Sequence, residues 1–340
     1  MKRNTYPAGK LPHADLARLI QTYTHTDPRL IVPPALGEDA AVIDFGDRYL
    51  VAKTDPITFA TEAIGWYAVH VNANDIAVMG ATPRFFLATI LLPEGDATPE
   101  LTESIFASLY EAAGSLGITV CGGHTEITCG LDRPIVVGQM LGEAAPDRLI
   151  RSSGLEPGDA LILTKGLAIE ATAVIAREKQ SELLKKGYSR RFVDRCAAFL
   201  EDPGISVVED ARIAADAGGV HAMHDPTEGG VATGLFELAA ASGVGMEIDA
   251  EALPIAPEPA RLCREFGLDP LGVISSGALL VGCAAEAAPR ILEALKRAGI
   301  PAARIGAVRE SGFGLKLRKE GRLVPLPAFS VDEITRLFGA

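Results

Sequence analysis

Apolar residues recur at helical spacing in three stretches of the first 145 residues. The stretches cover residues 11–23, 61–80 and 99–117. The second stops at Gly80, and Gly commonly follows the last turn of a helix. The third opens at Thr98 followed by Pro, a frequent helix start. The pattern therefore predicts three helices in this region.

Runs rich in apolar and β-branched residues separate these helices and predict strands. The runs cover residues 40–45, 49–55, 83–93, 118–130 and 134–144. Gly46-Asp47 forms the turn between the first two. The first region is therefore expected to be mixed α/β and to contain a sheet.

A second α/β region is predicted after the turn at residues 156–159, Glu-Pro-Gly-Asp. Helical patterns cover residues 167–179, 190–202, 207–218, 230–243 and 289–299. Short strand patterns cover residues 160–164, 246–249, 277–284, 303–308 and 315–318. We place the boundary near residues 145–157 and assign residues 1–148 to an N-terminal domain and 149–340 to a C-terminal domain.

Length and composition agree with two ordinary globular domains. The chain has 340 residues, of which 48% are hydrophobic and 22% charged. The net charge of 32 − 44 = −12 argues against a nucleic-acid or anionic-membrane partner. The five cysteines form no C-x-x-C pair. We expect reduced thiols and a cytoplasmic protein with neither a signal peptide nor a membrane span.

Polar residues gather where predicted strands meet loops. They are Glu38, Asp39, Asp55, Asp75, His124, Glu126, Asp225 and Glu228. Taken singly, most resemble ordinary helix caps or turn residues. Carboxylates brought together from separate loops would repel one another unless cations lie between them. Oxygen ligands favour Mg²⁺ or Ca²⁺ over Zn²⁺, and Mg²⁺ is commonly completed by nucleotide phosphates.

Several common enzyme classes are disfavoured. The chain has no P-loop motif and no G-x-G-x-x-G after a strand. The zinc-deaminase P-C-x-x-C and the G-x-S-x-G nucleophile elbow are absent too. A Cys121–His124 enzyme remains a minor alternative. Residues 164–171 run from a strand into a helix and give a weak signal for phosphate binding by backbone N–H groups.

The order of these motifs resembles the AIR synthase superfamily. The motifs are GEDAAVI, TD, NANDIAVMGATPR, GGHTE and DPTEGGV, spread over about residues 11 to 320. The superfamily includes AIR synthase, thiamine-monophosphate kinase, selenophosphate synthetase and HypE, a hydrogenase maturation factor. The segment from Asp225 onward most resembles HypE and its unassigned relatives.

The resemblance implies a two-domain α/β (α+β) fold whose N-terminal sheet pairs across a homodimer. It also implies ATP and Mg²⁺ in a cleft near that pairing. The implied reaction activates an oxygen of an acceptor by phosphorylation. We expect the acceptor to be a small molecule or a group carried by a protein, with a maturation partner protein as a further candidate.

Site residues follow from the matched motifs. The predicted metal ligands are Asp39, Asp55 and Asp75. The predicted nucleotide-binding residues are Lys53, Asn72, Gly122, Gly123 and Thr125. The predicted catalytic residues are His124, Asp225 and Glu228. In the NANDIA motif, Asn72 and Asn74 are expected to hold phosphates or metal-bound water beside Asp75.

The chain departs from its relatives at three places. Thiamine-monophosphate kinases usually carry Asp at the position of His124, which puts that kinase activity in doubt. HypE proteins typically carry Arg at the position of Glu228. The tail VDEITRLFGA lacks the terminal cysteine on which HypE carries its carbamoyl group. A kinase-like phosphotransferase and a nucleotide-binding maturation partner without turnover therefore stay as alternatives.

Overall fold

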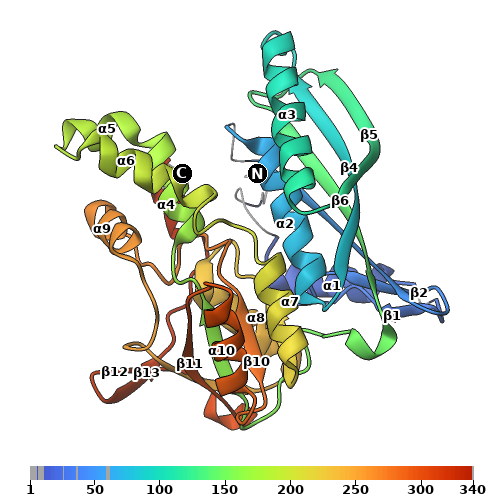
Figure 1. Ribbon diagram of the computed structural model, residues 1–340, viewed down its shortest axis with the longest axis vertical. Helices are drawn as coiled ribbons and strands as arrows, with labels where there is room; N and C mark the ends of the chain where they lie inside the picture. Colours follow the sequence, from blue (N-terminus) through green and yellow to red (C-terminus); the bar gives the residue numbers. More distant parts are fainter. Residues whose placement is uncertain (1–5, 7–10, 26, 36, 59–61, 339–340) are drawn as a thin grey trace, which may run out of the picture.

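The computed structural model describes residues 6, 11–25, 27–35, 37–58 and 62–338. Two sheets organise these residues, and Figure 1 shows them one above the other. The first sheet lies entirely before residue 148 and the second entirely after it. The prediction of a mixed α/β fold is confirmed. The domain limits 1–148 and 149–340 remain a prediction.

The first sheet has six strands in the order β1-β2-β3-β6-β4-β5. The strands are β1 Leu30–Val32, β2 Ala41–Asp44, β3 Tyr49–Ile57, β4 Thr82–Pro93, β5 Thr119–Thr128 and β6 Ile135–Ala144. The helices are α1 His13–Tyr23, α2 Ile64–Val78 and α3 Pro99–Ser115. The β4–β5 pair is parallel and the other pairs are antiparallel.

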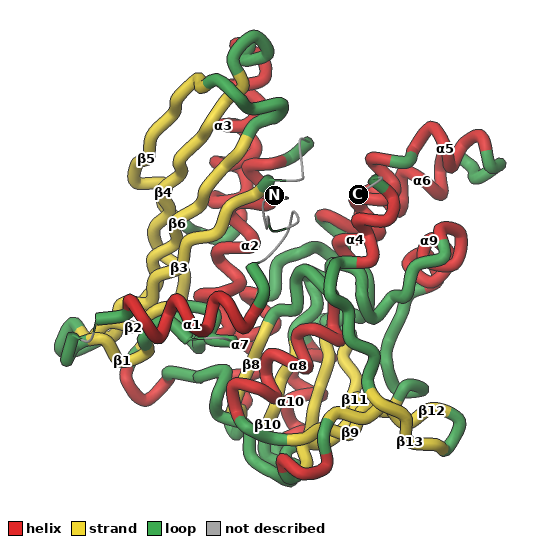
Figure 2. Tube along the Cα trace, turned by 180° about the vertical axis from the view of Figure 1, so that it is seen from behind, coloured by secondary structure: helices red, strands yellow, loops and turns green. Residues whose placement is uncertain are grey.

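Helices α2 and α3 cover one face of the first sheet. In Figure 2 the opposite face of β4, β5 and β6 is turned to the viewer and carries no helix. Thr98 caps α3 by accepting a hydrogen bond from Leu101 N. Its Oγ1 and the following Pro99 fulfil the predicted helix start. The prediction that α2 begins at residue 61 falls partly outside the described residues.

Helix α2 has no polar face, because it lies between the two halves of the molecule. Every residue from Ile64 to Val78 except Trp66 is buried. One side packs on β3, β4 and β6. Ala77 and Val78 pack instead in a core cluster of the second half. A helix that is buried on all sides is expected in such a position, and its polar residues His70, Asn72, Asn74 and Asp75 are buried with the rest.

The second sheet has seven strands in the order β13-β12-β9-β11-β7-β10-β8. The strands are β7 Ala160–Thr164, β8 Val220–His224, β9 Gly245–Asp249, β10 Leu280–Cys283, β11 Ala302–Arg309, β12 Leu315–Lys319 and β13 Arg322–Pro325. The helices are α4 Ile169–Glu178, α5 Gln180–Lys185, α6 Arg190–Ala197, α7 Val208–Ala217, α8 Gly230–Ser242, α9 Pro257–Phe266 and α10 Ala288–Arg297.

The sequence pattern did not predict β1, β8, β13, α5 or α9. The omission of β8 matters most, since its last residue is His224 and Asp225 follows directly. Its five residues, VHAMH, lack the β-branched run that marks the other strands. No helix in the described part of the chain is both long enough and apolar enough to cross a membrane.

Candidate functional site

Lys53 lies at the centre of a group of carboxylates between the two halves of the molecule. It projects from β3 on the same face as Val51, which packs under α2. Its Nζ is 3.2 Å from Asp75 Oδ1 on α2 and 3.6 Å from Asp55 Oδ2 on β3. The alternation of a strand explains why Lys53 and Asp55 share this face. The group therefore forms where β3 and α2 pack together.

Four carboxylates act on the Lys53 ammonium. Burial alone would lower the pKa of Lys53, but Asp75, Asp55, Asp39 and Asp225 together raise it above its ordinary value. Lys53 is therefore fully charged at neutral pH. The structure thus brings Asp39, Asp55, Asp75 and Lys53 together with Asp225, although they come from distant parts of the sequence.

Burial acts in the opposite direction on two of the carboxyl groups. Burial and the neighbouring Asp39 together raise the pKa of Asp225 to about 7, although His224 and Lys53 lower it in part. Burial also raises the pKa of Asp75, while Lys53 offsets part of this effect. A buried carboxylate is disfavoured in low dielectric unless a cation or hydrogen-bond donors compensate for it. A further positive charge beside Asp75 and Asp225 would therefore stabilise their ionised forms.

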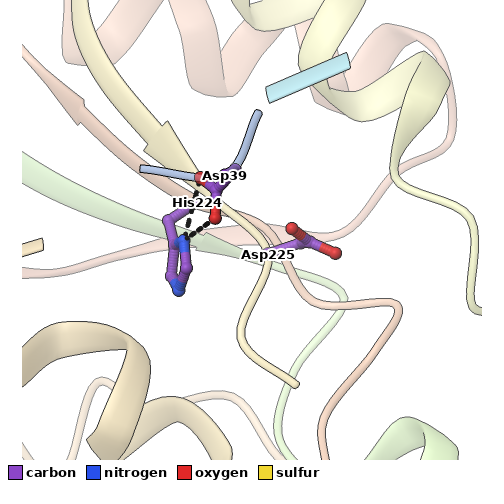
Figure 3. Close-up of side chains that lie close together, drawn as sticks. All are labelled: Asp39, His224 and Asp225. Carbon is purple, nitrogen blue, oxygen red and sulfur yellow. Dashed lines mark hydrogen bonds and ion pairs between the residues drawn. The ribbon is translucent and has the colours of Figure 1, made fainter. Parts of the chain in front are cut away.

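Asp39 is held by an imidazole ring, as Figure 3 shows. His224 Nδ1 is 2.9 Å from Asp39 Oδ1, and its Nε2 is 3.0 Å from Glu237 Oε2 on α8. Ser152 Oγ donates to Asp39 Oδ2 at 3.0 Å. Burial lowers the pKa of His224, but the two carboxylates outweigh it and raise the pKa well above the ordinary value. His224 is therefore an imidazolium that orients Asp39.

The donor set favours a hard cation. One ligand atom each of Asp39, His224 and Asp225 lies within 4.8 Å of the others. Both ring nitrogens of His224 are engaged by carboxylates, so the ring has no lone pair for a metal. Both oxygens of Asp225 and Oδ2 of Asp75 are buried without a hydrogen bond from another described residue. These carboxylate oxygens fit Mg²⁺, which prefers oxygen ligands.

The predicted glycine-rich residues lie elsewhere on the first sheet. Asp55 pairs with Gly138 on β6, Gly138 pairs with Ala88 on β4, and Ala88 pairs with Gly123 on β5. Three strand spacings of about 4.8 Å separate Gly123 from Asp55, so about 14 Å lie between their backbones. In a single copy, Gly122, Gly123, His124 and Thr125 therefore do not reach the carboxylate group.

His124 and Glu228 have different surroundings. The His124 side chain is 68% exposed on β5, and its Nε2 is 3.4 Å from Glu126 Oε2. Glu228 is half-buried three residues after Asp225 and interacts electrostatically with Glu170 and Asp332. The catalytic roles of Asp225, His124 and Glu228 remain predictions.

The two asparagines of α2 serve different purposes. Asn72 is fully buried and donates to Ala68 O and Asp55 O, while its Oδ1 has no partner among the described residues. Asn74 donates to Ile205 O at 2.9 Å and accepts from Val207 N at 2.8 Å. The prediction that Asn74 holds phosphate or metal-bound water is therefore wrong, because its amide joins α2 to the second half.

The weak phosphate signal at residues 164–171 loses most of its donors. Four consecutive amides of this turn donate to acceptors within the protein. The pairs are Lys165 N to Pro301 O, Gly166 N to Thr164 O, Leu167 N to Pro254 O and Ala168 N to Ser275 Oγ. His70 is buried, and its ring packs at a tilt of 48° against Trp66 with ring centroids 4.5 Å apart.

Family models match most of the chain. Residues 37–144 match the AIR synthase related protein N-terminal domain, and residues 156–317 match the corresponding C-terminal domain. The chain belongs to the AIR synthase superfamily. The predicted membership, and with it the prediction of an enzyme of this superfamily, is confirmed.

Among its AIR synthase relatives is the carbamoyl dehydratase HypE of Rhizobium leguminosarum bv. viciae. The two are 35% identical over 284 residues, which cover 80% of this chain and 77% of the relative. The structure of a HypE–HypF complex matches with a TM-score of 0.71 at 25% identity, covering 85% of this chain and 93% of that one. HypE in complex with ATP has a TM-score of 0.72 at 23% identity, covering 93% and 91%. The last likeness shows the fold alone.

Sequence reasoning missed three residues of the group: His224, Glu237 and Ser152. His224 stands directly before Asp225 in the motif that carries the resemblance. Because β8 was not predicted, the sequence did not show where His224 lies in the fold. Glu237 lies two turns into α8, and no local signal indicates that it faces β8.

Proposed function

We propose that this chain is a Mg²⁺-dependent enzyme that uses ATP to activate an oxygen of an acceptor by phosphorylation. The observation that carries the proposal is the carboxylate group around Lys53, in which Asp75 and Asp225 keep buried oxygens that receive no hydrogen bond from the described residues. The folded chain spends free energy to bury these charges. Such a cost is expected where a bound cation and its phosphate ligands offset it.

The residues divide the work by chemistry. Asp39, Asp55 and Asp75 would hold Mg²⁺, and the Lys53 ammonium beside them would pair with phosphate oxygens. Mg²⁺, when bound, neutralises charge that develops on the transferred phosphoryl group. His224 keeps Asp39 oriented through its hydrogen bonds. Asp225, whose buried oxygens lie beside Asp39 at the end of β8, would face the metal-bound nucleotide and there accept a proton or orient the acceptor.

Relatives named carbamoyl dehydratase support the acceptor class. An oxygen that carries a phosphoryl group leaves as phosphate, so a carbamoyl-type oxygen becomes removable. We infer that the acceptor is a small molecule or a group carried by another protein. The HypE–HypF complex supports the second route, because that HypE assembles with a second protein.

We also propose that a homodimer completes the site. The uncovered face of the first sheet carries Phe85, which is 45% exposed, next to the half-exposed Leu87 and Leu141. Gly122 to Thr125 lie on the edge strand of this sheet, where a second copy can bring them toward a partner's carboxylate group. Phe85→Glu is expected to convert a dimer to monomers in light-scattering measurements. A wild-type chain that is monomeric at all concentrations would contradict this arrangement.

Calorimetric titration with a non-hydrolysable ATP analogue tests the nucleotide site. Binding is expected with Mg²⁺ and is expected to weaken by about tenfold or more in Asp75→Asn, since a charge-assisted ligand is lost. Asp132→Asn is the matched control, because its side chain is 81% exposed and lies far along the chain from α2. Equal affinities in the two variants would count against the site.

Phosphate release separates turnover from binding alone. A coupled assay with a peptide that carries a carbamoylated cysteine is expected to release phosphate faster than ATP alone. Binding without release under any acceptor would favour the alternative of a nucleotide-binding maturation partner. ADP formation with thiamine monophosphate would favour the kinase-like alternative.

A further inference from the structure

The segment after the last strand returns to the loops beside the candidate site. Residues 326–338 follow β13, and Leu326 N donates to Leu315 O. Leu326 and Ile334 are buried in the largest core cluster of the second half. The segment is therefore part of the folded core up to the short helix Glu333–Leu337.

Two loops beneath this segment are bound to each other. The first is residues 225–230, which carries Asp225 and Glu228, and the second is residues 271–276. Ser275 N donates to Thr227 O at 3.3 Å. A Cβ on Gly230 would lie 2.4 Å from Leu271 O, so the loops approach too closely for any side chain there. The position of one loop therefore depends on the other.

The segment is attached to both loops. Asp332 Oδ2 accepts a hydrogen bond from Gly229 N at 2.7 Å. Glu333 N donates to Gly272 O at 3.0 Å. A Cβ on Gly272 would lie 2.5 Å from the ring of Phe329. These contacts fasten residues 329–333 across the pair of loops.

Asp332 takes the place of a helix cap. Gly229 is the N-cap of α8, has a φ of 78° and supplies no side chain to the first turn. The Asp332 carboxylate accepts the Gly229 N–H from 103 positions away. Its other oxygen accepts from Ile334 N at 2.8 Å. A negative charge at a helix N-terminus is favourable, and here it comes from a distant segment.

We propose that Asp332 is a positioning residue that holds the loop of residues 225–230, and with it Asp225, in place for the reaction. This inference rests on the proposed function in placing Asp225 in the site. Asp332 acts through Gly229 and does not touch the carboxylate group around Lys53. Its loss loosens the loop while the rest of the second sheet stays folded.

Hydrogen exchange and nucleotide affinity test the proposal in the full chain. The variants are Asp332→Ala and Asp332→Asn, with Arg336→Ala as the matched control in the same segment. Arg336 is exposed and contacts Glu333 and Gly267 O but not Gly229. In Asp332→Ala, exchange in residues 226–231 is expected to rise by about tenfold or more, with β7 unchanged, since a hydrogen bond to a charged group is lost. Asp332→Asn keeps one acceptor oxygen and is expected to restore part of the protection.

Affinity for a non-hydrolysable ATP analogue with Mg²⁺ gives the second readout. We expect about tenfold weaker binding in Asp332→Ala at a temperature well below its melting point, and no change in Arg336→Ala. Unchanged exchange in Asp332→Ala would overturn the attachment of the loop. Faster exchange with unchanged affinity would overturn the positioning role. Absence of binding in the wild type would instead overturn the proposed function, while the exchange measurement would still decide whether Asp332 holds the loop.

Discussion

The carboxylate group around Lys53 and the glycine-rich strand β5 were predicted as parts of one site, yet they differ in almost every physical respect. The first lies between β3, α2 and β8, with Asp39, Asp75 and Asp225 buried, and ion pairs already join Lys53 to Asp55 and Asp75 and His224 to Asp39. The second is the edge strand of the first sheet, and eight of its ten residues are exposed. One half of the predicted site is thus preformed, and the other half faces outward.

The difference shows that motif order does not reveal whether two motifs meet within one copy of the chain. The sheet register places β5 three strands from Asp55, too far for contact. Burial also implies opposite mutational behaviour. Changes at the buried group act on folding and binding together, whereas changes on β5 are expected to act mainly on assembly and binding.

The largest expected effect is that of Lys53→Met. Removing the cation leaves Asp55 and Asp75 without their ion pairs, so the unfolding free energy is expected to fall by about 4 kcal/mol at pH 7 without Mg²⁺. Urea denaturation measures this loss, and saturating Mg²⁺ is expected to restore part of it. Lys319→Met, at an exposed position of β12, serves as the control. A loss no greater than that of the control would contradict the central role of Lys53.

Glu170→Gln tests the effect of burial on a carboxyl group outside the group around Lys53, in the first turn of α4. Burial, partly offset by Ser276, raises the pKa of Glu170 from 4.5 to about 7 in the folded chain. Because the folded pKa is raised, the unfolded chain ionises first, so the contribution of Glu170 to stability is fully present below about pH 4.5 and is lost as pH rises to about 7. The fall is roughly 3 kcal/mol, and Gln is expected to abolish it. Wild-type and variant denaturation curves with equal pH dependence would contradict this.

The stability costs of substituting two neighbouring glycines, Gly122 and Gly123, test how closely β5 packs against β4. Gly122 and Gly123 have φ of 155° and 151°, so an added Cβ is strained at both. Only at Gly123 does the Cβ meet backbone, 2.0 Å from Ala88 O on β4. Gly123→Ala is therefore expected to cost about 2 kcal/mol more than Gly122→Ala in thermal or urea unfolding. Equal costs would show that β4 and β5 are less tightly paired than the register indicates.

The smallest effect on stability is expected for His124→Ala. Its side chain is mostly exposed and its contact with Glu126 is long, so the unfolding free energy is expected to change by less than about 0.5 kcal/mol. Affinity for Mg²⁺ and an ATP analogue is expected to fall only at protein concentrations where two copies associate. A weaker affinity in the monomer would instead place His124 in the site of its own chain.

The sequence predicted most of the helices and the aspartates of the carboxylate group around Lys53, and each prediction has a physical or sequence reason. Long periodic runs and a strong cap at Thr98 predict α3 without tertiary information. Asp39, Asp55 and Asp75 follow from the motif resemblance. The role of Asn74 could not be predicted in this way, because it depends on contacts with residues 205–207, more than a hundred positions away. The short strand β8 lacks a local pattern, and its paired neighbour β10 defines it.

Asn74 and Asp75 are consecutive on a helix without a face toward water. Adjacent helical side chains diverge by about 100°, so one reaches the second half while the other reaches the ammonium of β3. The dipeptide thus supplies both a hydrogen-bonded link to residues 205–207 and an acidic group directed at Lys53. Inserting a single residue ahead of it would rotate both side chains away from their partners, so this helix has little freedom to change length.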